Sequence, residues 1–389
     1  MEVILAGAEW KERILESANR IFGQDPEKGG FAALMPEIYG ESGNCSENHF
    51  LVLEKGRIVA MALVEPVCFV CGKERLSGVG VGTVGVAEEE RGRGHMKLLM
   101  HTIREWMERE RYSFAVLSGQ RQRYAYWGYE PAGIRCEAFF SGPSVRHALT
   151  EKATRGIEKR MSLEPLEAGS REEELSWKLY DSQEVRLERR KESFAAHLRS
   201  GRCQPFCIRA EEEFAGYLTA SFRGKVRIVE IQLTKKALFP AALKLFCQQK
   251  APEGFLLDLP PFGEWAGMAE RLSESLLIRS GHQYYIADPC RMLEFFLKVK
   301  QKQTGLAEGS WDFETEEGVF RAWVQAGQVQ VGRSPGGAAG SAPAPWKTDK
   351  EGEWIRKLFG PYAPISGSLP GIPEGWLPLP VFLPEIDAV

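Results

Sequence analysis

Residues 81–100 read VGTVGVAEEERGRGHMKLLM, and this stretch decides the fold. A valine-rich strand runs into an acidic turn, and the sequence Arg91-Gly-Arg-Gly94 then opens an amphipathic helix. Three features that bind phosphate coincide there: free backbone N–H groups, the positive end of the helix dipole and two guanidinium groups. Gly92 and Gly94 lack the Cβ atoms that would keep a diphosphate away from the backbone. The stretch therefore predicts a site for a nucleotide-type cofactor, and with it an enzyme.

The composition is that of a globular protein with more than one domain. At 389 residues, 43% of them hydrophobic and 26% charged, the chain is too long for one ordinary core. A net charge of −3 excludes a general attraction to nucleic acid or to an anionic membrane. No apolar run approaches the ~20 residues that span a bilayer, and the N-terminus lacks the basic start of a secretory signal. We therefore expect a cytoplasmic protein.

The eight cysteines and six histidines show no spacing that is typical of a metal site. Cys68 and Cys71 fall in a strand-like run, where positions i and i+3 point to opposite faces. We expect reduced, half-buried thiols that behave as small hydrophobic side chains, and no bound metal. His95 and His101 flank the helix of the cofactor site, and we expect them on the surface rather than in catalysis.

Hydrophobic periodicity divides the chain into three units, with boundaries near residues 150 and 287. The first unit, residues 1–150, alternates strands and helices, which predicts a mixed α/β sheet with the cofactor at a strand-to-helix junction. Its expected elements are a helix over 9–22, strands over 49–54, 57–66 and 77–86, a helix over 94–110 and a strand over 113–118. Gly29 and Gly30 are expected in the loop after the first helix.

The second unit, residues 151–287, repeats this order without a glycine-arginine loop, which favours a degenerate copy that lacks the cofactor site. Its expected elements include a helix over 184–198, strands over 204–209, 214–220 and 225–233, and a helix over 236–248. The third unit, residues 288–389, should contain a helix over 289–301, strands over 309–316 and 319–331, and a helix over 350–358. We expect a mobile loop over 334–345, which is rich in small residues, and a C-terminal tail that packs on the protein.

Gly80, Gly82 and Gly85 match the spacing G-x-G-x-x-G of dinucleotide-binding loops. That fingerprint requires a helix directly after it, whereas here the helix begins only near residue 94. Glycine inside a strand more often marks the close approach of a ligand or of another backbone segment. We therefore reject a dinucleotide site and expect such a close approach.

Three motifs between residues 78 and 129 resemble the GNAT family of acetyl-CoA-dependent N-acetyltransferases. They are Val84-Gly-Val86, Arg91-Gly-Arg-Gly94 and Tyr124-x-x-x-Gly128-Tyr129. The family's loop reads Gln/Arg-x-x-Gly-x-Gly/Ala, so Arg91 and Gly94 fit, whereas Met96 stands where Gly or Ala is usual. The resemblance implies that the loop holds the diphosphate of acetyl-CoA and that the strand aligns the pantetheine arm and polarises the thioester. The residues implied are Val84, Gly85, Val86, Arg91, Gly92, Arg93 and Gly94.

The whole chain is similar, in length and in the order of its units, to the Eis (enhanced intracellular survival) proteins. That resemblance implies tandem GNAT-type mixed sheets flanked by helices, the second without cofactor, and a C-terminal α+β domain like that of sterol carrier proteins. It implies a homo-oligomer, often a hexamer in the family. It also implies an amine acceptor, which in the family is an aminoglycoside, a polyamine or a lysine side chain.

The resemblance assigns the chemistry to Tyr124 and to the C-terminal carboxylate of Val389. A phenol with a pKa near ~10 is protonated at neutral pH, so Tyr124 can act as the general acid toward the departing CoA thiolate. The alternative is that Tyr124 only packs on the sheet as part of an aromatic face. The carboxylate of Val389 would take the proton of the amine, directly or through water. Family members usually end in an aromatic residue, whereas this chain ends in Ala-Val, and a solvated terminus is the alternative.

We expect the amine to attack the thioester directly, because no cysteine or serine stands in a nucleophile–base arrangement. A rival hypothesis is a non-catalytic binding protein whose third unit carries an apolar ligand, with the first two units as inert scaffold. The intact loop and Tyr124 argue against it. Binding of acetyl-CoA distinguishes the two hypotheses.

Overall fold

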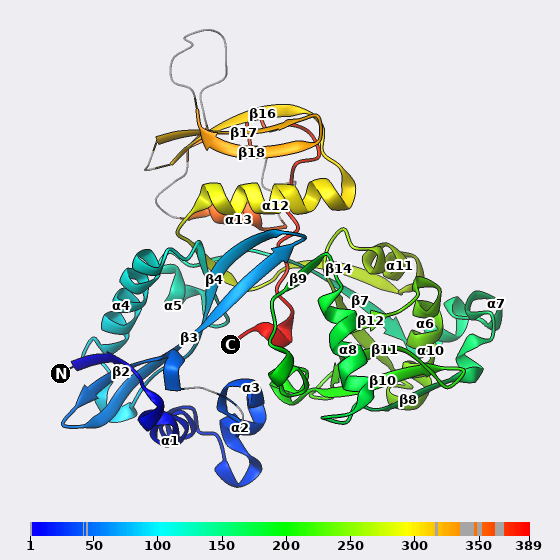
Figure 1. The fold of residues 1–389 in the computed structure, drawn as a ribbon, viewed down its shortest axis with the longest axis horizontal. Coiled ribbons are helices and arrows are strands. Elements are labelled where there is room, and N and C mark those ends of the chain that lie inside the picture. The colour runs from blue at the N-terminus through cyan, green and yellow to red at the C-terminus, as the bar shows by residue number, and fades with distance from the viewer. Residues whose placement is uncertain are drawn as a thin grey trace.

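The computed structural model describes residues 2–41, 43, 46–315, 318–334, 346–347, 352–361 and 369–389. In these residues the chain forms three sheets of eight, seven and four strands (Figure 1). The first two sheets lie side by side, and the third lies above them at the far end of a long hairpin. No helix in the described part of the chain is long and apolar enough to cross a membrane.

The first sheet has the strand order β1-β2-β3-β4-β5-β15-β6. The seven strands of this path are β1 (Glu2–Leu5), β2 (His49–Glu54), β3 (Arg57–Cys71), β4 (Glu74–Val86), β5 (Phe114–Leu117), β6 (Glu130–Pro131) and β15 (Gln283–Ile286). The eighth strand of the sheet, β9 (Val185–Leu187), pairs with β3. The helices of this part are α1 (Lys11–Phe22), α2 (Gly30–Leu34), α3 (Pro36–Tyr39), α4 (His95–Glu110) and α5 (Arg121–Ala125). The predicted order of elements over residues 9–118 is confirmed, except that Gly30 begins a helix. The hairpin β3–β4 is longer than predicted, because its far end is buried in the core of the third domain, where Phe69 and Leu76 pack.

The second sheet has the order β14-β7-β13-β12-β11-β10-β8. Its strands are β7 (Ile134–Ser141), β8 (Met161–Pro165), β10 (Gln204–Ala210), β11 (Glu213–Ser221), β12 (Arg227–Leu233), β13 (Gly254–Leu259) and β14 (Ser275–Ser280). Its helices are α6 (Gly142–Ala148), α7 (Glu151–Thr154), α8 (Arg171–Asp181), α9 (Phe194–His197), α10 (Phe239–Lys250) and α11 (Glu264–Leu272). The strands predicted over 204–233 and the helix over 236–248 are confirmed to within a few residues.

The helix predicted over residues 184–198 is wrong. Its first part is the strand β9 (Val185–Leu187), and only Phe194–His197 are α-helical. Strand β9 pairs antiparallel with Phe69–Cys71 of β3. This part of β3 lies beyond the end of β2, so its edge would otherwise be unpaired. Tertiary pairing therefore decides the local structure here.

The first two sheets exchange strands. Strand β7 lies before the expected boundary near residue 150, yet it pairs with β13 and β14 in the second sheet. Strand β15 lies near the end of the second unit, yet it is inserted between β5 and β6 of the first sheet. The chain therefore passes from the first sheet to the second at residues 132–134, adds β9 to the first sheet on the way, and returns to the first sheet at residue 283.

The third domain begins with α12 (Pro289–Thr304), as predicted. It continues with β16 (Gly309–Thr315), β17 (Gly318–Gln325), β18 (Gln328–Arg333), β19 (Trp346–Lys347) and α13 (Glu353–Phe359). The single strand predicted over 319–331 is a hairpin, because Ala326 and Gly327 both adopt positive φ and form its turn. Most of the loop predicted over 334–345 lies outside the described residues.

The C-terminal tail packs on the protein, as predicted. Val381 and Leu383 are buried, and the backbone N–H of Ile134 donates to the carbonyl of Val381 at 2.6 Å. The tail runs down from the third domain between the first two, and the C-terminus lies beside β3 (Figure 1). A segment of the last domain therefore reaches the first sheet.

Candidate active site

The loop before α4 has the backbone that a phosphate site requires. Gly92 and Gly94 have φ values of 79° and 83°, in the left-handed region that favours glycine. A Cβ at either position would meet no atom within 4 Å, so the space in front of the loop is open. Gly94 is the N-cap of α4 and provides no side-chain cap, so the first backbone N–H groups of this helix remain available.

A cavity of about 620 Å³, here called the cofactor pocket, lies in front of this loop. It is lined by six of the seven residues predicted to bind cofactor: Val84, Gly85, Val86, Arg91, Gly92 and Gly94. Met96 also lines it, at the position where the family pattern has Gly or Ala. Arg93 is the exception, because its guanidinium group pairs with Glu90 at 2.6 Å.

The two histidines of α4 differ in environment. His101 is exposed, as predicted, and pairs with Glu105. The prediction for His95 is wrong, because its side chain is buried and lines the cofactor pocket. Its Nε2 atom lies 4.0 Å from Glu54 of β2. The first helical turn packs against the sheet, and that contact buries His95.

Beside the cofactor pocket, strand β4 separates from β5 and shifts its register against β3. Its parallel pairing with β5 covers only Val79 and Gly80, and its register with β3 shifts before Gly85. Thr83 lies at this shift with a φ of 45°, which is strained for a β-branched residue. Tyr39 holds it there by donating a hydrogen bond of 2.8 Å to its hydroxyl oxygen. The strained backbone of Thr83 and the part of β4 that no longer pairs with β5 therefore both lie next to Val84.

Tyr124 lies on α5 and is 7% exposed. Its ring packs edge-on against Tyr129, with the ring centroids 6.2 Å apart, and lies against Gly119, where a Cβ would be 2.6 Å from its Cε2 atom. Burial raises the pKa of Tyr124, although nearby Arg123 acts in the opposite direction. The preceding residue, Arg123, lines the cofactor pocket, whereas Tyr124 itself is not among the residues that line it.

The C-terminal residue lies on β4. A Cβ at Gly82 would be 2.5 Å from the carboxylate carbon of Val389, and one at Gly80 would be 2.7 Å from its Cγ2 atom. The expectation that these glycines mark the close approach of another backbone segment is confirmed, and that segment is the C-terminus. Gly82 precedes Val84 of the cofactor pocket by two residues, so the terminal carboxylate lies near the edge of that pocket.

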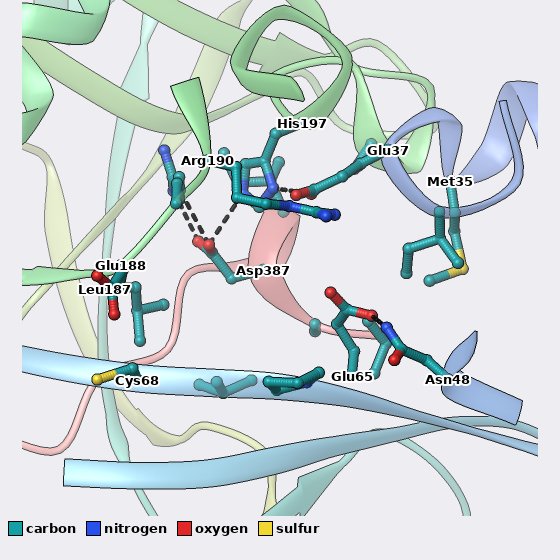
Figure 2. Close-up of a pocket in the computed structure, with 18 of the residues that line it drawn as sticks. Met35, Glu37, Asn48, Glu65, Cys68, Leu187, Glu188, Arg190, His197 and Asp387 are labelled. Carbon is teal, nitrogen blue, oxygen red and sulfur yellow. Dashed lines mark hydrogen bonds and ion pairs between the residues drawn. The ribbon is translucent and has the colours of Figure 1, made fainter. Parts of the chain in front are cut away.

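A second cavity of about 570 Å³, here called the tail pocket, surrounds Val389. Residues from α3, from the strands β3 and β4, from the second domain and from the tail line it (Figure 2). Its acidic residues are Glu37, Glu47, Glu65, Glu188 and Asp387, together with the terminal carboxylate. Sequence reasoning missed Glu37, Glu47, Glu65 and Glu188.

Asp387 fixes the tail through a buried set of charged groups, here called the tail network: Glu37, Arg189, His197, Glu230 and Asp387. Arg189 donates to both carboxylate oxygens of Asp387, at 2.9 and 2.6 Å, and to both of Glu230, at 3.0 and 2.6 Å. His197 Nε2 lies 2.9 Å from Asp387, and its Nδ1 contacts Glu37 of the first domain. The network therefore ties the tail to both neighbouring domains.

His197 and Asp387 of the tail network are both charged at neutral pH. Burial and Arg189 disfavour the charged form of His197, but Asp387 and Glu37 outweigh them and raise the pKa of His197 to about 9. Burial also disfavours the charged form of Asp387, but Arg189 and His197 hold the pKa of its carboxyl well below the usual range. Each buried charge therefore faces opposite charges.

We expect the stability of the protein to depend on the protonation of His197. The pKa of this group is raised on folding, so its stabilisation is complete below pH ~6.5 and is lost as the pH rises through about 9. The melting temperature should therefore fall between pH 7 and pH 10, and it should fall less in His197→Gln. Differential scanning calorimetry across this range measures the effect, with His101→Gln as the exposed control. Parallel pH profiles for wild type and His197→Gln would contradict this role.

Residues 3–132 match the family model described as an acetyltransferase (GNAT) domain. The first domain is a GNAT acetyltransferase domain. The chain is therefore an acyltransferase, as the glycine-arginine loop and Tyr124 predicted, and the non-catalytic carrier is not favoured. A comparison with curated proteins found no match.

Several solved structures share the fold over most of the chain. A GCN5-related N-acetyltransferase from Kribbella flavida is 16% identical, with a TM-score of 0.59, and the match covers 87% of this chain and 84% of that one. A GCN5-related N-acetyltransferase from Anabaena variabilis is 19% identical, with a TM-score of 0.57 and 86% of each chain covered. Eis1 from Mycobacterium abscessus is 13% identical, with a TM-score of 0.54, and 86% of this chain and 85% of that one are covered. The predicted mixed α/β class with GNAT-type sheets is confirmed.

Proposed function

We propose that the protein transfers the acetyl group of acetyl-CoA to a primary amine by direct attack. One observation carries the proposal: the carboxylate of Val389 lies on Gly82, two residues along β4 from the cofactor pocket. The open pocket in front of the glycine-arginine loop and the pocket lined with carboxylates thus lie on either side of the strained Thr83. The first suits acetyl-CoA, and the second suits a cationic amine.

The proposed binding of acetyl-CoA uses the residues of the cofactor pocket. Arg91, Gly92 and Gly94 would hold the diphosphate, and Arg93, which pairs with Glu90, would steady the loop. The backbone of Val84, Gly85 and Val86 would align the pantetheine arm and donate hydrogen bonds to the thioester carbonyl. The separation of β4 from β5 beyond Gly80 leaves room for that arm.

In the proposed reaction the amine enters the tail pocket as an ammonium ion. The carboxylate of Val389 takes its proton, directly or through water, and the free amine attacks the thioester. Tyr124 then protonates the departing thiolate, and its raised pKa keeps the phenol protonated at neutral pH. No acyl-enzyme forms.

The finer classification is also part of the proposal. We infer an Eis-like cytoplasmic enzyme with a catalytic domain over 1–150, a degenerate copy over 151–287 and a sterol-carrier-like domain over 288–389. The first two domains exchange the strands β7 and β15. The acceptor would be an aminoglycoside, a polyamine or a lysine side chain. A homo-oligomer is supported by Leu277 and Ile278, which are 49% and 58% exposed on β14 at the edge of the second sheet.

Calorimetric titration with acetyl-CoA tests the cofactor site. We expect binding by the wild type, and binding about 10-fold weaker in Arg91→Ala, because a charge-assisted hydrogen bond is lost. Arg104→Ala, on the exposed face of α4, is the control. Thiol release in the presence of a panel of amines then tests turnover. Absence of acetyl-CoA binding by the wild type would contradict the proposed function.

A further inference from the structure

We propose that Glu65 is a further catalytic residue, which forms a carboxylate pair with the C-terminus and shares the proton that the amine loses. This inference rests on the proposed function. It gives a role to the half-buried acidic residue of β3 that lines the tail pocket.

The register of the sheet places Glu65 next to the terminal residue. Glu65 is paired with Gly80 across β3 and β4. Residues directly opposite each other in an antiparallel pair point to the same face, with their Cβ positions about 5 Å apart. Gly80 is also the glycine that contacts the side chain of Val389. The side chain of Glu65 therefore lies on the face of the sheet that Val389 covers.

The carboxylate of Glu65 points into the tail pocket (Figure 2). Asn48 donates to its Oε2 atom, and this is the one hydrogen bond of the carboxylate among the described residues. Three of the other acidic residues of the pocket are engaged elsewhere: Asp387 and Glu37 pair within the tail network, and Glu188 pairs with Arg75. The remaining one, Glu47, is exposed. Glu65 is thus a carboxylate beside the terminus that has no cationic partner within ion-pair distance in the described structure.

The surroundings of Glu65 suit a proton acceptor. Burial and the nearby carboxylate of Glu37 raise the pKa of Glu65 to about 7, although Asn48, Arg190 and His197 act in the opposite direction. Asp387 and the terminal carboxylate, from the tail, also line the same cavity. A base whose pKa lies near the working pH is the most effective, whereas an unperturbed terminal carboxyl, with a pKa of about 3.5, holds a proton weakly.

The proton balance is simple. The nitrogen forms a bond to the acetyl carbon, the carbon–sulfur bond breaks, and the thiolate takes the proton of Tyr124. The protons that leave the nitrogen go to the Glu65–Val389 pair and from there to solvent, and Tyr124 recovers its own proton from solvent. Two neighbouring carboxylates that share one proton titrate as a pair, so the pair can hold a proton at a pH where a lone carboxyl cannot.

Glu65→Gln tests the proposal, because it keeps the shape of the side chain and removes its basicity. We expect kcat at pH 7 to fall roughly 100-fold, while the KM of the amine and the affinity for acetyl-CoA stay within about twofold. The rise of kcat between pH 6 and pH 8 should disappear. Glu74→Gln is the matched control, because Glu74 lies on the same hairpin, outside both pockets, and forms only a half-exposed ion pair with Lys298.

Unchanged kcat and pH dependence in Glu65→Gln would overturn the proposal, and so would a change in KM alone, which indicates ammonium binding. If Glu65→Gln does not bind acetyl-CoA, Glu65→Asp is the second test. This variant keeps a carboxylate but holds it one methylene group closer to the backbone of β3. If the pH at which kcat rises is shifted in Glu65→Asp, the proposal is supported. If that pH is the same as in the wild type, the proposal is overturned. Failure of the proposed function is recognised separately, because the wild type would then not bind acetyl-CoA or release thiol.

Discussion

Arg189→Ala is expected to lower the free energy of unfolding by about 3–5 kcal/mol, because it leaves the buried carboxylates of Asp387 and Glu230 without their shared cation. The guanidinium group is 1% exposed and also stacks on the ring of Tyr180, 4.1 Å from its centroid. Turnover should fall as well, because Asp387 anchors the tail two residues before the terminal carboxylate. Urea unfolding and thiol release measure the two effects.

Arg160→Ala is the control for this prediction. Its ion pair with Glu211 is exposed on both sides, so less than about 1 kcal/mol should be lost. The double variant Arg189→Ala/Asp387→Asn should lose less than the sum of the single variants, because both remove the same interaction. Additive losses, or a loss below about 1 kcal/mol in Arg189→Ala, would show that the tail is held by other contacts.

Tyr124→Phe is expected to lower kcat by roughly 100- to 10,000-fold while acetyl-CoA binding is retained, because only the acidic proton is removed. The ring stays in place against Tyr129 and Gly119, so the fold should be unaffected. In the wild type, kcat should also fall at high pH, above the ordinary tyrosine pKa of about 10, since burial raises the pKa of Tyr124. Thiol release between pH 6 and pH 11 measures both effects.

Tyr126→Phe is the matched control, because it removes the same hydroxyl group two residues away. Tyr126 is 74% exposed and packs edge-on against Trp127, so turnover should be unchanged. Equal turnover in Tyr124→Phe and wild type would leave the aromatic packing as the only role of Tyr124.

The sequence predicted the parts of the site that are local in the chain. The strand, loop and helix over residues 77–110 carry their own hydrophobic period and turn residues, so the fold of the first domain and the loop Arg91–Gly94 could be found. Glu37, Glu65, Arg189 and His197 could not be found, because they come from separate segments with no shared motif. Two signals of the tail pocket were present in the sequence: Gly80 and Gly82 indicated a close approach but not the approaching segment, and the family resemblance alone pointed to the carboxylate of Val389.

The strand exchange between the first two sheets has a consequence for the synthesis of the protein. Strand β15 is the neighbour of both β5 and β6, yet it follows β6 by about 150 residues. At the usual ~5–20 residues per second, a ribosome needs roughly 8–30 s to make that segment. During this time the nascent acetyltransferase domain exposes an unpaired strand edge, which is a binding site for chaperones and a risk for aggregation. A gene fragment that ends at residue 132 would leave that edge open permanently, so the catalytic domain is not expected to be obtained as an independent soluble unit.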